Sequence, residues 1–280
     1  METSDIKKYA AILLPYLLER KKGKPCSMSL KMSILCFILY KCKTGCQWRM
    51  LPMSEFSEEK TSWQNVYYHF RNWITDGVFS KAWTDLLKQN KSKLDMSIVN
   101  FDGSQTISKK GGEYVAYQKR KKAKTTNMLY MTDKQGVVIS VSEPIAGNHN
   151  DLFNITTYFK QMINDLNAAE IATDGLFLNA DAGFDGDDFR EFLLIEGIIP
   201  IIPENPRNTK KNKELNTDYQ HFDELCYQYR FSVERSFSWL DSLKNTLVRY
   251  DFLAKTWSTF VKISMLFILI RKFLLSFSLS

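Results

Sequence analysis

Apolar residues recur at the three-and-four spacing of α-helices through the first 90 residues of the chain. This pattern predicts helices over residues 5–20 and 28–42. After a stretch that contains Pro and Ser, it predicts two more helices, over residues 63–73 and 78–89. Asp76-Gly77 has the chemistry of a tight turn between the last two helices.

The last two predicted helices raise the question of DNA binding. Short helices joined by a glycine turn, with Tyr68, Arg71 and Asn72 on the polar side, suit a helix-turn-helix reader of DNA. The same spacing also suits a plain helical bundle, and the pattern by itself does not separate the two interpretations.

From about residue 97 the pattern changes to short apolar runs typical of strands, and then to alternating helices and strands. This order predicts an α/β fold, a mixed sheet flanked by helices, with a hairpin turn at residues 133–136. We expect an all-helical domain over residues 1–92 and the mixed-sheet domain with C-terminal helices over residues 93–280. The predicted strands are 97–103, 127–133, 136–144, 175–181 and 198–203; the predicted helices are 151–168, 187–197 and, after a polar loop at 204–220, a long helix over 221–246 and final apolar helices.

Composition narrows the class of protein. With 44% hydrophobic and 25% charged residues, the 280-residue chain has the make-up of an ordinary globular protein. The net charge of +7 and the pI near 9.0 favour a polyanionic partner such as nucleic acid. Five cysteines without framework spacing are typical of a reducing cytosol, and a cytoplasmic location is predicted.

The apolar C-terminal run is the one candidate for a membrane segment. Lys262, Arg271 and Lys272 interrupt it and leave eight uninterrupted residues, short of the roughly 20 that a bilayer requires. A buried or interfacial helix is predicted there, and no membrane partner is expected.

Three acidic residues stand where a sheet and a helix could bring them together. Asp102 and Asp181 are each predicted to close a strand, where ligand sites form in open sheets. Carboxylate oxygens are the ligands that Mg²⁺ and Mn²⁺ prefer, and one more acid would complete a two-metal site. Glu234 on the long predicted helix offers it, on a stripe with Tyr227, Arg230 and Asp241. The alternative is a solvated helix face with an Arg230–Glu234 pair at i, i+4.

Asp181 lies in "NADAGFDGDD", which has three further aspartates. A calcium loop is excluded because the Asp-x-Asp-x-Asp-Gly ladder and its distant Glu are absent. Asp187 and Asp188 are typical of a helix start, and Asp185 is assigned to the turn.

A series of blocks resembles one known family. These are "CQWRMLP…WQNVYYHFRNWITDGVF", "FDGS", "GGEYVAYQKRKKAKTTNMLYMTDKQG", "AGNHNDL", "NADAGFDGDDFREFL" and "YRFSVERSFSWLDSLKNTLVRYD". In this order, over about residues 28 to 265, they are similar to the blocks of bacterial insertion-sequence transposases of the DDE type, the group typified by insertion sequence five. The resemblance implies a ribonuclease-H-like catalytic fold in which Asp102, Asp181 and Glu234 bind two divalent ions, Mg²⁺ or Mn²⁺. Before it, the all-helical N-terminal domain is expected to bind DNA.

One family signature is matched only in part. The family's helix carries Tyr, two residues, Arg, three residues, Glu, then six residues and a Lys or Arg. Tyr227, Arg230 and Glu234 satisfy it, but Asp241 stands at the basic position. That basic residue is expected to contact DNA near the cut, where an aspartate would repel phosphate. Lys244 or Arg235 are the candidates to replace it.

The resemblance implies a transposase that cuts the ends of its insertion sequence and joins the freed 3′-OH to target DNA. Its partners would be the terminal inverted repeats, target DNA and further copies of the chain, as a homodimer or a higher synaptic oligomer. It would be cytoplasmic and associated with the nucleoid when bound to DNA. Two alternatives share the sequence: a catalytically impaired or repurposed DNA-binding protein, and a metal-dependent nuclease without strand transfer.

The segment 109–124 has seven basic residues and one acid, with two tyrosines among them. It suits contact with a DNA backbone; the alternative is a solvated loop. The candidate contacts are Lys119, Arg120, Lys121, Lys122 and Lys124, together with Arg71, Arg235 and Lys244. His149 and Asp151 in "AGNHNDL" are secondary candidates: Asp151 is explained as a helix cap, and His149 either assists near the metals or bonds within its loop.

Overall fold

The computed structural model describes residues 3–17, 26–57, 59–206 and 223–275. The chain forms two compact units. The first comprises Met1–Leu86, Thr106–Glu113 and Trp239–Ser280, and the second comprises Leu87–Gln105 and Tyr114–Ser238. The C-terminal apolar helix therefore belongs to the same unit as the N-terminal helices.

The core of the first unit is helical. Helix α2 (Met28–Thr44) contacts α1 (Thr3–Leu13), α4 (Trp63–Thr75) and the C-terminal helix α11 (Ala254–Ile270). Ser27 caps the start of α2, and Gly45, with φ +67°, ends it because glycine adopts the left-handed conformation without strain. α11 is buried over nearly its whole length, with the Phe260 ring 4.8 Å from that of Phe70.

The helices predicted over residues 63–73 and 78–89 are confirmed as α4 and α5 (Val78–Gln89), with Gly77 at φ +69° between them. The helix predicted over residues 5–20 is wrong in length. It ends at Leu13 and passes into the 3₁₀ turn η1 (Leu14–Tyr16), because Pro15 has no N–H to continue the helical ladder. Residues 18–20 lie outside the described part of the chain.

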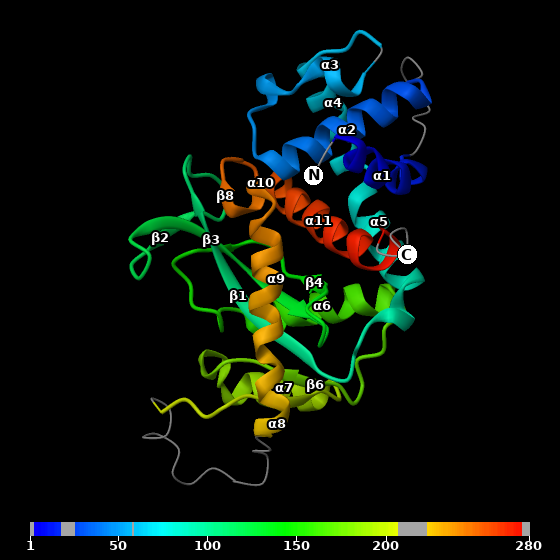
Figure 1. The fold of residues 1–280 in the computed structure, drawn as a ribbon. Coiled ribbons are helices and arrows are strands. Elements are labelled where there is room, and N and C mark those ends of the chain that lie inside the picture. Colours follow the sequence, from blue (N-terminus) through cyan, green and yellow to red (C-terminus); the bar gives the residue numbers. More distant parts are fainter. Residues whose placement is uncertain (1–2, 18–25, 58, 207–222, 276–280) are drawn as a thin grey trace. The chain divides into compact units, whose positions relative to one another are not determined.

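The second unit is built on a mixed sheet of order β2-β3-β1-β6-β7 (Figure 1). The pairs β1–β6 and β6–β7 are parallel, whereas β2, β4 and β5 pair antiparallel with β3. Asp133 Oδ1 accepts the N–H of Val137 at 2.7 Å and Gly136 has φ +82°, which confirms the predicted hairpin. The strands are β1 (Val99–Ser108), β2 (Ala116–Gln118), β3 (Ala123–Thr132), β4 (Val138–Val141), β5 (Ile145–Ala146), β6 (Phe177–Asn179) and β7 (Ile199–Ile201).

Aromatic side chains form the core of this unit. Helix α6 (Ile155–Ala168) contacts β4, and α7 (Asp187–Ile195) contacts β7. Between these elements the ring centroid of Phe101 lies 5.1 Å from that of Phe159 and 4.9 Å from that of Phe184, and all three residues are fully buried. Phe101 thereby anchors β1 one residue before Asp102.

The long helix predicted over residues 221–246 is confirmed over Glu224–Asp241, which is helical without a gap, and is wrong beyond Asp241, where residues 242–243 interrupt it. The continuous part consists of α8 (Glu224–Tyr227), the 3₁₀ turn η6 (Gln228–Arg230) and α9 (Phe231–Asp241), and α10 (Lys244–Leu247) follows the interruption. The Asn179 side chain donates to the carbonyl of Cys226 at 2.7 Å, just before the 3₁₀ turn. The extended conformation of Leu243 separates α9 from α10. Residues 221–222 and most of the predicted loop at 204–220 lie outside the described residues.

The remaining elements are short. In the first unit β8 (Val248–Arg249) pairs parallel with the end of β1, at Ile107 and Ser108. None of the helices in the described ranges has the length and hydropathy needed to cross a membrane. The other helical segments are η2 (Trp48–Met50), α3 (Met53–Phe56), η3 (Lys91–Lys93), η4 (Ala182–Phe184) and the π-helical end η7 (Arg271–Leu275).

Candidate active site

Asp102 and Asp181 follow paired positions on two parallel strands. Asn100 of β1 is the register partner of Asn179 of β6, and each aspartate comes two residues later. The prediction that Asp102 closes its strand is wrong, because β1 continues to Ser108 and pairs there with β8. Asp181 lies just beyond β6, which ends at Asn179, and caps η4 by accepting the N–H of Gly183 at 2.8 Å.

The pKa of Asp102 is raised to about 7, mainly by burial and then by the nearby carboxylates of Asp181 and Asp151. The N–H of Gly103, 2.7 Å from Asp102 Oδ1, and the guanidinium of Arg230 act in the opposite direction. Burial disfavours the charged form of a carboxyl group, and nearby carboxylates add to the same effect. The structure thus places Asp102, Asp181 and Asp151 within electrostatic range of one another.

Arg230 links Asp102 to Glu234. Its guanidinium lies 3.7 Å from Asp102 Oδ2 and 3.1 Å from Glu234 Oε1, and its side chain is 19% exposed. Glu234 lies in the first turn of α9 and is 48% exposed. Arg230 lies at the end of the 3₁₀ turn and Glu234 in the first turn of α9. Their offset of four residues brings the two side chains together on one face. Tyr227 ends α8, with its ring centroid 6.0 Å from the Arg230 guanidinium carbon.

Asp151 is a fourth acid beside these residues, and its assignment as a helix cap is wrong. α6 begins at Ile155, four residues later, and Asp151 instead accepts a 2.6 Å hydrogen bond from Asn127 Nδ2 of β3. A Cβ atom at Gly103 would come within 2.6 Å of Asp151 Oδ1, so any other residue there would displace the Asp151 carboxylate. The pKa of Asp151 is raised, first by burial and then by Asp181, while Asn127 and Arg120 lower it.

His149, the other secondary candidate, stacks on Phe153 with ring centroids 3.6 Å apart and an interplanar angle of 16°. This contact accounts for its place in the loop before α6. A role of His149 near the metals stays a prediction.

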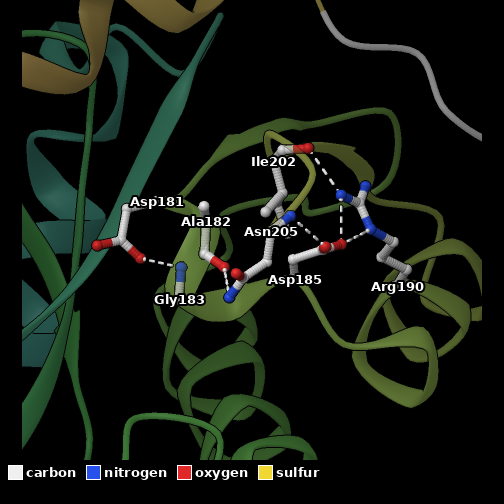
Figure 2. A network of polar contacts seen from close by, with 7 residues as sticks. All are labelled: Asp181, Ala182, Gly183, Asp185, Arg190, Ile202 and Asn205. Carbon is white, nitrogen blue, oxygen red and sulfur yellow. Dashed lines mark hydrogen bonds and ion pairs between the residues drawn. The ribbon is translucent and has the colours of Figure 1, made fainter. Parts of the chain in front are cut away.

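The acidic run after β6 divides as predicted (Figure 2). Asp185 forms an ion pair with Arg190 at 2.8 Å and accepts the N–H of Asn205 at 2.6 Å. The Asn205 side chain donates to the carbonyl of Ala182, so Asp185 and Asn205 hold the turn that follows Asp181. Asp187 and Asp188 occupy the exposed first turn of α7, where acids favour the helix dipole.

The donor set of this site is made of oxygens. Asp102, Asp181 and Glu234 offer carboxylates only, which suits Mg²⁺ or Mn²⁺ rather than a soft metal. In the described ranges no three Asp, Glu, His or Cys side chains stand close enough to hold an ion. Arg230 places positive charge between Asp102 and Glu234, and burial still raises the pKa of Asp102 to about 7. By their chemistry the residues fit a divalent cation.

The basic candidates of the second unit are exposed. Lys119, Arg120, Lys121, Lys122 and Lys124 lie in and beside the turn between β2 and β3. Lys121 Nζ donates to the carbonyl of Gln105 at 2.8 Å, and Arg120 acts on Asp151. Arg235, on α9, is also exposed.

In the first unit the exposed candidates are Arg71 of α4 and Lys244, the first residue of α10. Asp241 is the last residue of α9. Because α9 ends there, Asp241 and Lys244 do not lie on one continuous helix. Whether Lys244 takes the family's basic position stays a prediction.

Sequence reasoning did not find Asn127 or the pairing of Asn100 with Asn179. No periodicity marks Asn127, since its partner Asp151 is 24 residues away and meets it only through the fold. The asparagines two residues before Asp102 and Asp181 were visible in the sequence, but their contact follows from strand register.

Comparison with known proteins defines first the fold and then the family. The fold is similar to that of a piggyBac transposase in a synaptic complex with hairpin DNA, at 12% identity and a TM-score of 0.50, over 99% of this chain and 73% of that one. A Mos1 transposase paired-end complex with the left transposon end also matches, at 12% identity and a TM-score of 0.29, over 83% of each chain. Sequence comparison with curated proteins gives no match. The fold is ribonuclease-H-like: a mixed sheet with flanking helices after a helical N-terminal region.

Two family profiles match the sequence. Residues 10–83 match the family described as "Putative transposase of IS4/5 family", and residues 91–269 match the family described as "Transposase DDE domain". The second match covers more than half of the chain. The protein belongs to the DDE transposases, which confirms the DDE resemblance seen in the sequence, and its N-terminal region is similar to the IS4/5 family.

Proposed function

We propose that this protein cuts the ends of an insertion sequence and joins the freed 3′-OH to target DNA by phosphodiester transfer. The observation that carries the proposal is the contact of Arg230 with both Asp102 and Glu234, with Asp181 within electrostatic range of Asp102, in a chain of the DDE family. The structures similar in fold include transposases bound to DNA, which supports DNA as the partner and a synaptic oligomer as the working form.

Asp102, Asp181 and Glu234 would hold two divalent cations, Mg²⁺ or Mn²⁺. Bound there, the cations would activate a water for attack on the strand and neutralise charge on the leaving 3′ oxygen. The residues of the chain prepare the site: the turn held by Asp185 and Asn205 orients Asp181, and Gly103 lets Asp102 and Asp151 approach. Arg230 would hold Asp102 and Glu234 together until the cations take over the compensation of charge.

DNA would be held by exposed basic side chains. We assign Lys119, Lys122 and Lys124 to phosphate contacts near the β2–β3 turn, with Arg120, Lys121 and Arg235 as further candidates. Arg71 and Lys244 are proposed contacts of the first unit, in which residues 1–92 would read the terminal inverted repeats. Cytoplasmic location and association with the nucleoid follow from this function.

The test is to replace single ligands. Asp181→Asn or Glu234→Gln should lower Mg²⁺-dependent cleavage of the element's end DNA by at least about a hundredfold, because each removes a ligand charge that the cations need. Binding of the same DNA in EDTA should stay within about threefold of wild type. Asp187→Asn, an exposed acid on α7, is the matched control and should cleave normally. Undiminished cleavage by either ligand variant would exclude the assignment.

A second function is favoured by one observation. Asp241 stands where the family has a basic residue, so this copy could bind DNA ends without completing transfer. The same reactions decide between the candidates when joined products are measured beside cleaved ends. Joined products would indicate a transposase. Cleaved ends without joined products would indicate a nuclease. Uncleaved ends bound in a stable complex would indicate a DNA-binding protein.

A further inference from the structure

Each of the three proposed metal ligands follows a buried polar residue by two positions. Asn100 precedes Asp102, Asn179 precedes Asp181 and Ser232 precedes Glu234. Both asparagines are fully buried and Ser232 is 7% exposed. On a helix, residues two apart point in nearly opposite directions, so Ser232 faces inward while Glu234 faces outward.

These three side chains bond to one another. Asn100 Nδ2 donates to Ser232 Oγ at 2.7 Å, and Asn179 Nδ2 donates to Asn100 Oδ1 at 3.1 Å. Asn179 Nδ2 also donates to the carbonyl of Cys226 at 2.7 Å. A continuous chain of hydrogen bonds therefore joins β6 to β1 and β1 to α9, the three elements that carry or directly precede the acids.

The choice of polar residues here needs a reason. Buried amide and hydroxyl groups are costly unless they are hydrogen-bonded, whereas apolar side chains of similar size would pack without that cost. The cost is offset in one arrangement only, because a shift of α9 along β1 would break the Asn100–Ser232 bond and leave both groups unpaired. Asn179 Oδ1 has no hydrogen-bond partner among the described residues, so even this arrangement carries a residual cost. Such a network fixes the alignment of β6, β1 and α9 more than it adds to the free energy of unfolding.

We propose that Asn100, Asn179 and Ser232 form an internal clamp that holds the metal-binding acids of the transposase in mutual register. They are positioning residues, since each acts through the acid two residues later. The inference rests on the proposed function, because the clamp aligns acids whose ligand role is itself proposed. Its clearest consequence concerns Glu234, which is half exposed and whose helix is attached to β1 through the Ser232–Asn100 bond.

α9 offers a matched control one turn further on. Ser236 is also fully buried, and its Oγ donates to the carbonyl of Gly136 at 2.6 Å. This bond attaches the same helix to the β3–β4 turn, which carries none of the three acids. Ser232→Ala and Ser236→Ala therefore remove the same hydroxyl from the same helix, but only the first loosens the link to β1.

The experiment measures Mn²⁺ binding to the full chain by electron paramagnetic resonance, in the absence of DNA, for wild type and both alanine variants. Ser232→Ala should weaken Mn²⁺ binding about tenfold, the usual effect of losing an outer partner of a metal site, and Ser236→Ala should leave it unchanged. Ser232→Thr keeps a hydroxyl and should restore binding. Cleavage should show the same order, with a larger loss in Mg²⁺ than in Mn²⁺ for Ser232→Ala, because Mg²⁺ demands stricter geometry.

Asp181→Asn separates the two levels of the proposal. If it abolishes Mn²⁺ binding while Ser232→Ala and Ser236→Ala behave alike, the metal site stands and the clamp is wrong. If Ser232→Thr binds Mn²⁺ as poorly as Ser232→Ala, the hydroxyl is not the cause and the clamp is again wrong. If Asp181→Asn binds Mn²⁺ like wild type, the metal site fails and the clamp has nothing to align. Thermal unfolding of all variants shows that each is folded.

Discussion

At the scale of single residues, the site is a cluster of acids with too little compensating charge. Asp102 combines burial with the nearby carboxylates of Asp181 and Asp151, while Arg230 is shared with Glu234. The raised pKa of Asp102 means that folding favours the protonated, uncharged form of this carboxyl group.

This shift in pKa makes the stability of the metal-free protein depend on pH. The pKa of Asp102 rises from 3.8 to about 7 on folding, so the folded state holds its proton more tightly than the unfolded state. The free energy of unfolding therefore falls as pH rises from about 4 to about 7, and the loss is complete above that range. Asp102→Asn removes the titrating group and should escape this loss.

We expect Asp102→Asn to gain stability relative to wild type between pH 5 and pH 8, by about 1–2 kcal/mol after allowance for partial exposure. Denaturant unfolding in EDTA at the two pH values measures it, with the exposed Asp187→Asn as control. A difference between Asp102→Asn and wild type that does not change with pH would contradict the raised pKa.

At the scale of elements, turns place the side chains of the candidate site. The Cys226 carbonyl accepts from Asn179 just before the 3₁₀ turn that joins α8 to α9, and the β2–β3 turn presents exposed basic side chains. All five basic residues of that turn are exposed, but Lys121 also donates to the Gln105 carbonyl and Arg120 also lowers the pKa of Asp151. The other three are Lys119, Lys122 and Lys124. Phosphate contact is best tested on the last three.

Replacing Lys119, Lys122 and Lys124 with Ala should flatten the slope of log affinity against log salt by about 0.9 for each phosphate contact that is lost. A charge-matched control replaces Lys88, Lys91 and Lys160, whose ammonium groups pair with Glu170 and Glu196. Filter binding or fluorescence anisotropy over a range of salt concentrations measures both slopes. Equal slopes for the two triple variants would mean that the turn is only solvated.

At the scale of the whole molecule, the ends of the chain share one compact unit. α11 packs on α2 and α4, and Cys42 Sγ of α2 lies 3.3 Å from Ser264 Oγ of α11. The predicted division at residue 92 assigns these helices to different domains, and as a division of function it stays a prediction. As a matter of packing, the N-terminal helices complete their core with residues from the C-terminus.

Phe260 tests this dependence. It is fully buried, with its ring centroid 4.8 Å from that of Phe70 and 6.1 Å from that of Trp48. Phe260→Ala should lower the free energy of unfolding by about 3–5 kcal/mol, the usual cost of removing a buried aromatic ring. Phe252→Ala, at a position 64% exposed, is the control and should change it by less than about 0.5 kcal/mol. A small effect at Phe260 would mean that α11 does not support the N-terminal helices.

Local pattern determined much of this protein. Helical spacing located α2, α4 and α5, and Asp133 and Gly136 located the hairpin, because these elements depend on residues that are close in the sequence. The order of the motifs along the chain identified the family. Tertiary structure alone decided three other points. They are the 3₁₀ turn before Glu234, the hydrogen-bond partner of Asp151, and the hydrogen bonds among Asn100, Asn179 and Ser232. Each of these features joins groups that are distant in the sequence. Strand register and burial bring such groups together, and the spacing of residues along the chain predicts neither.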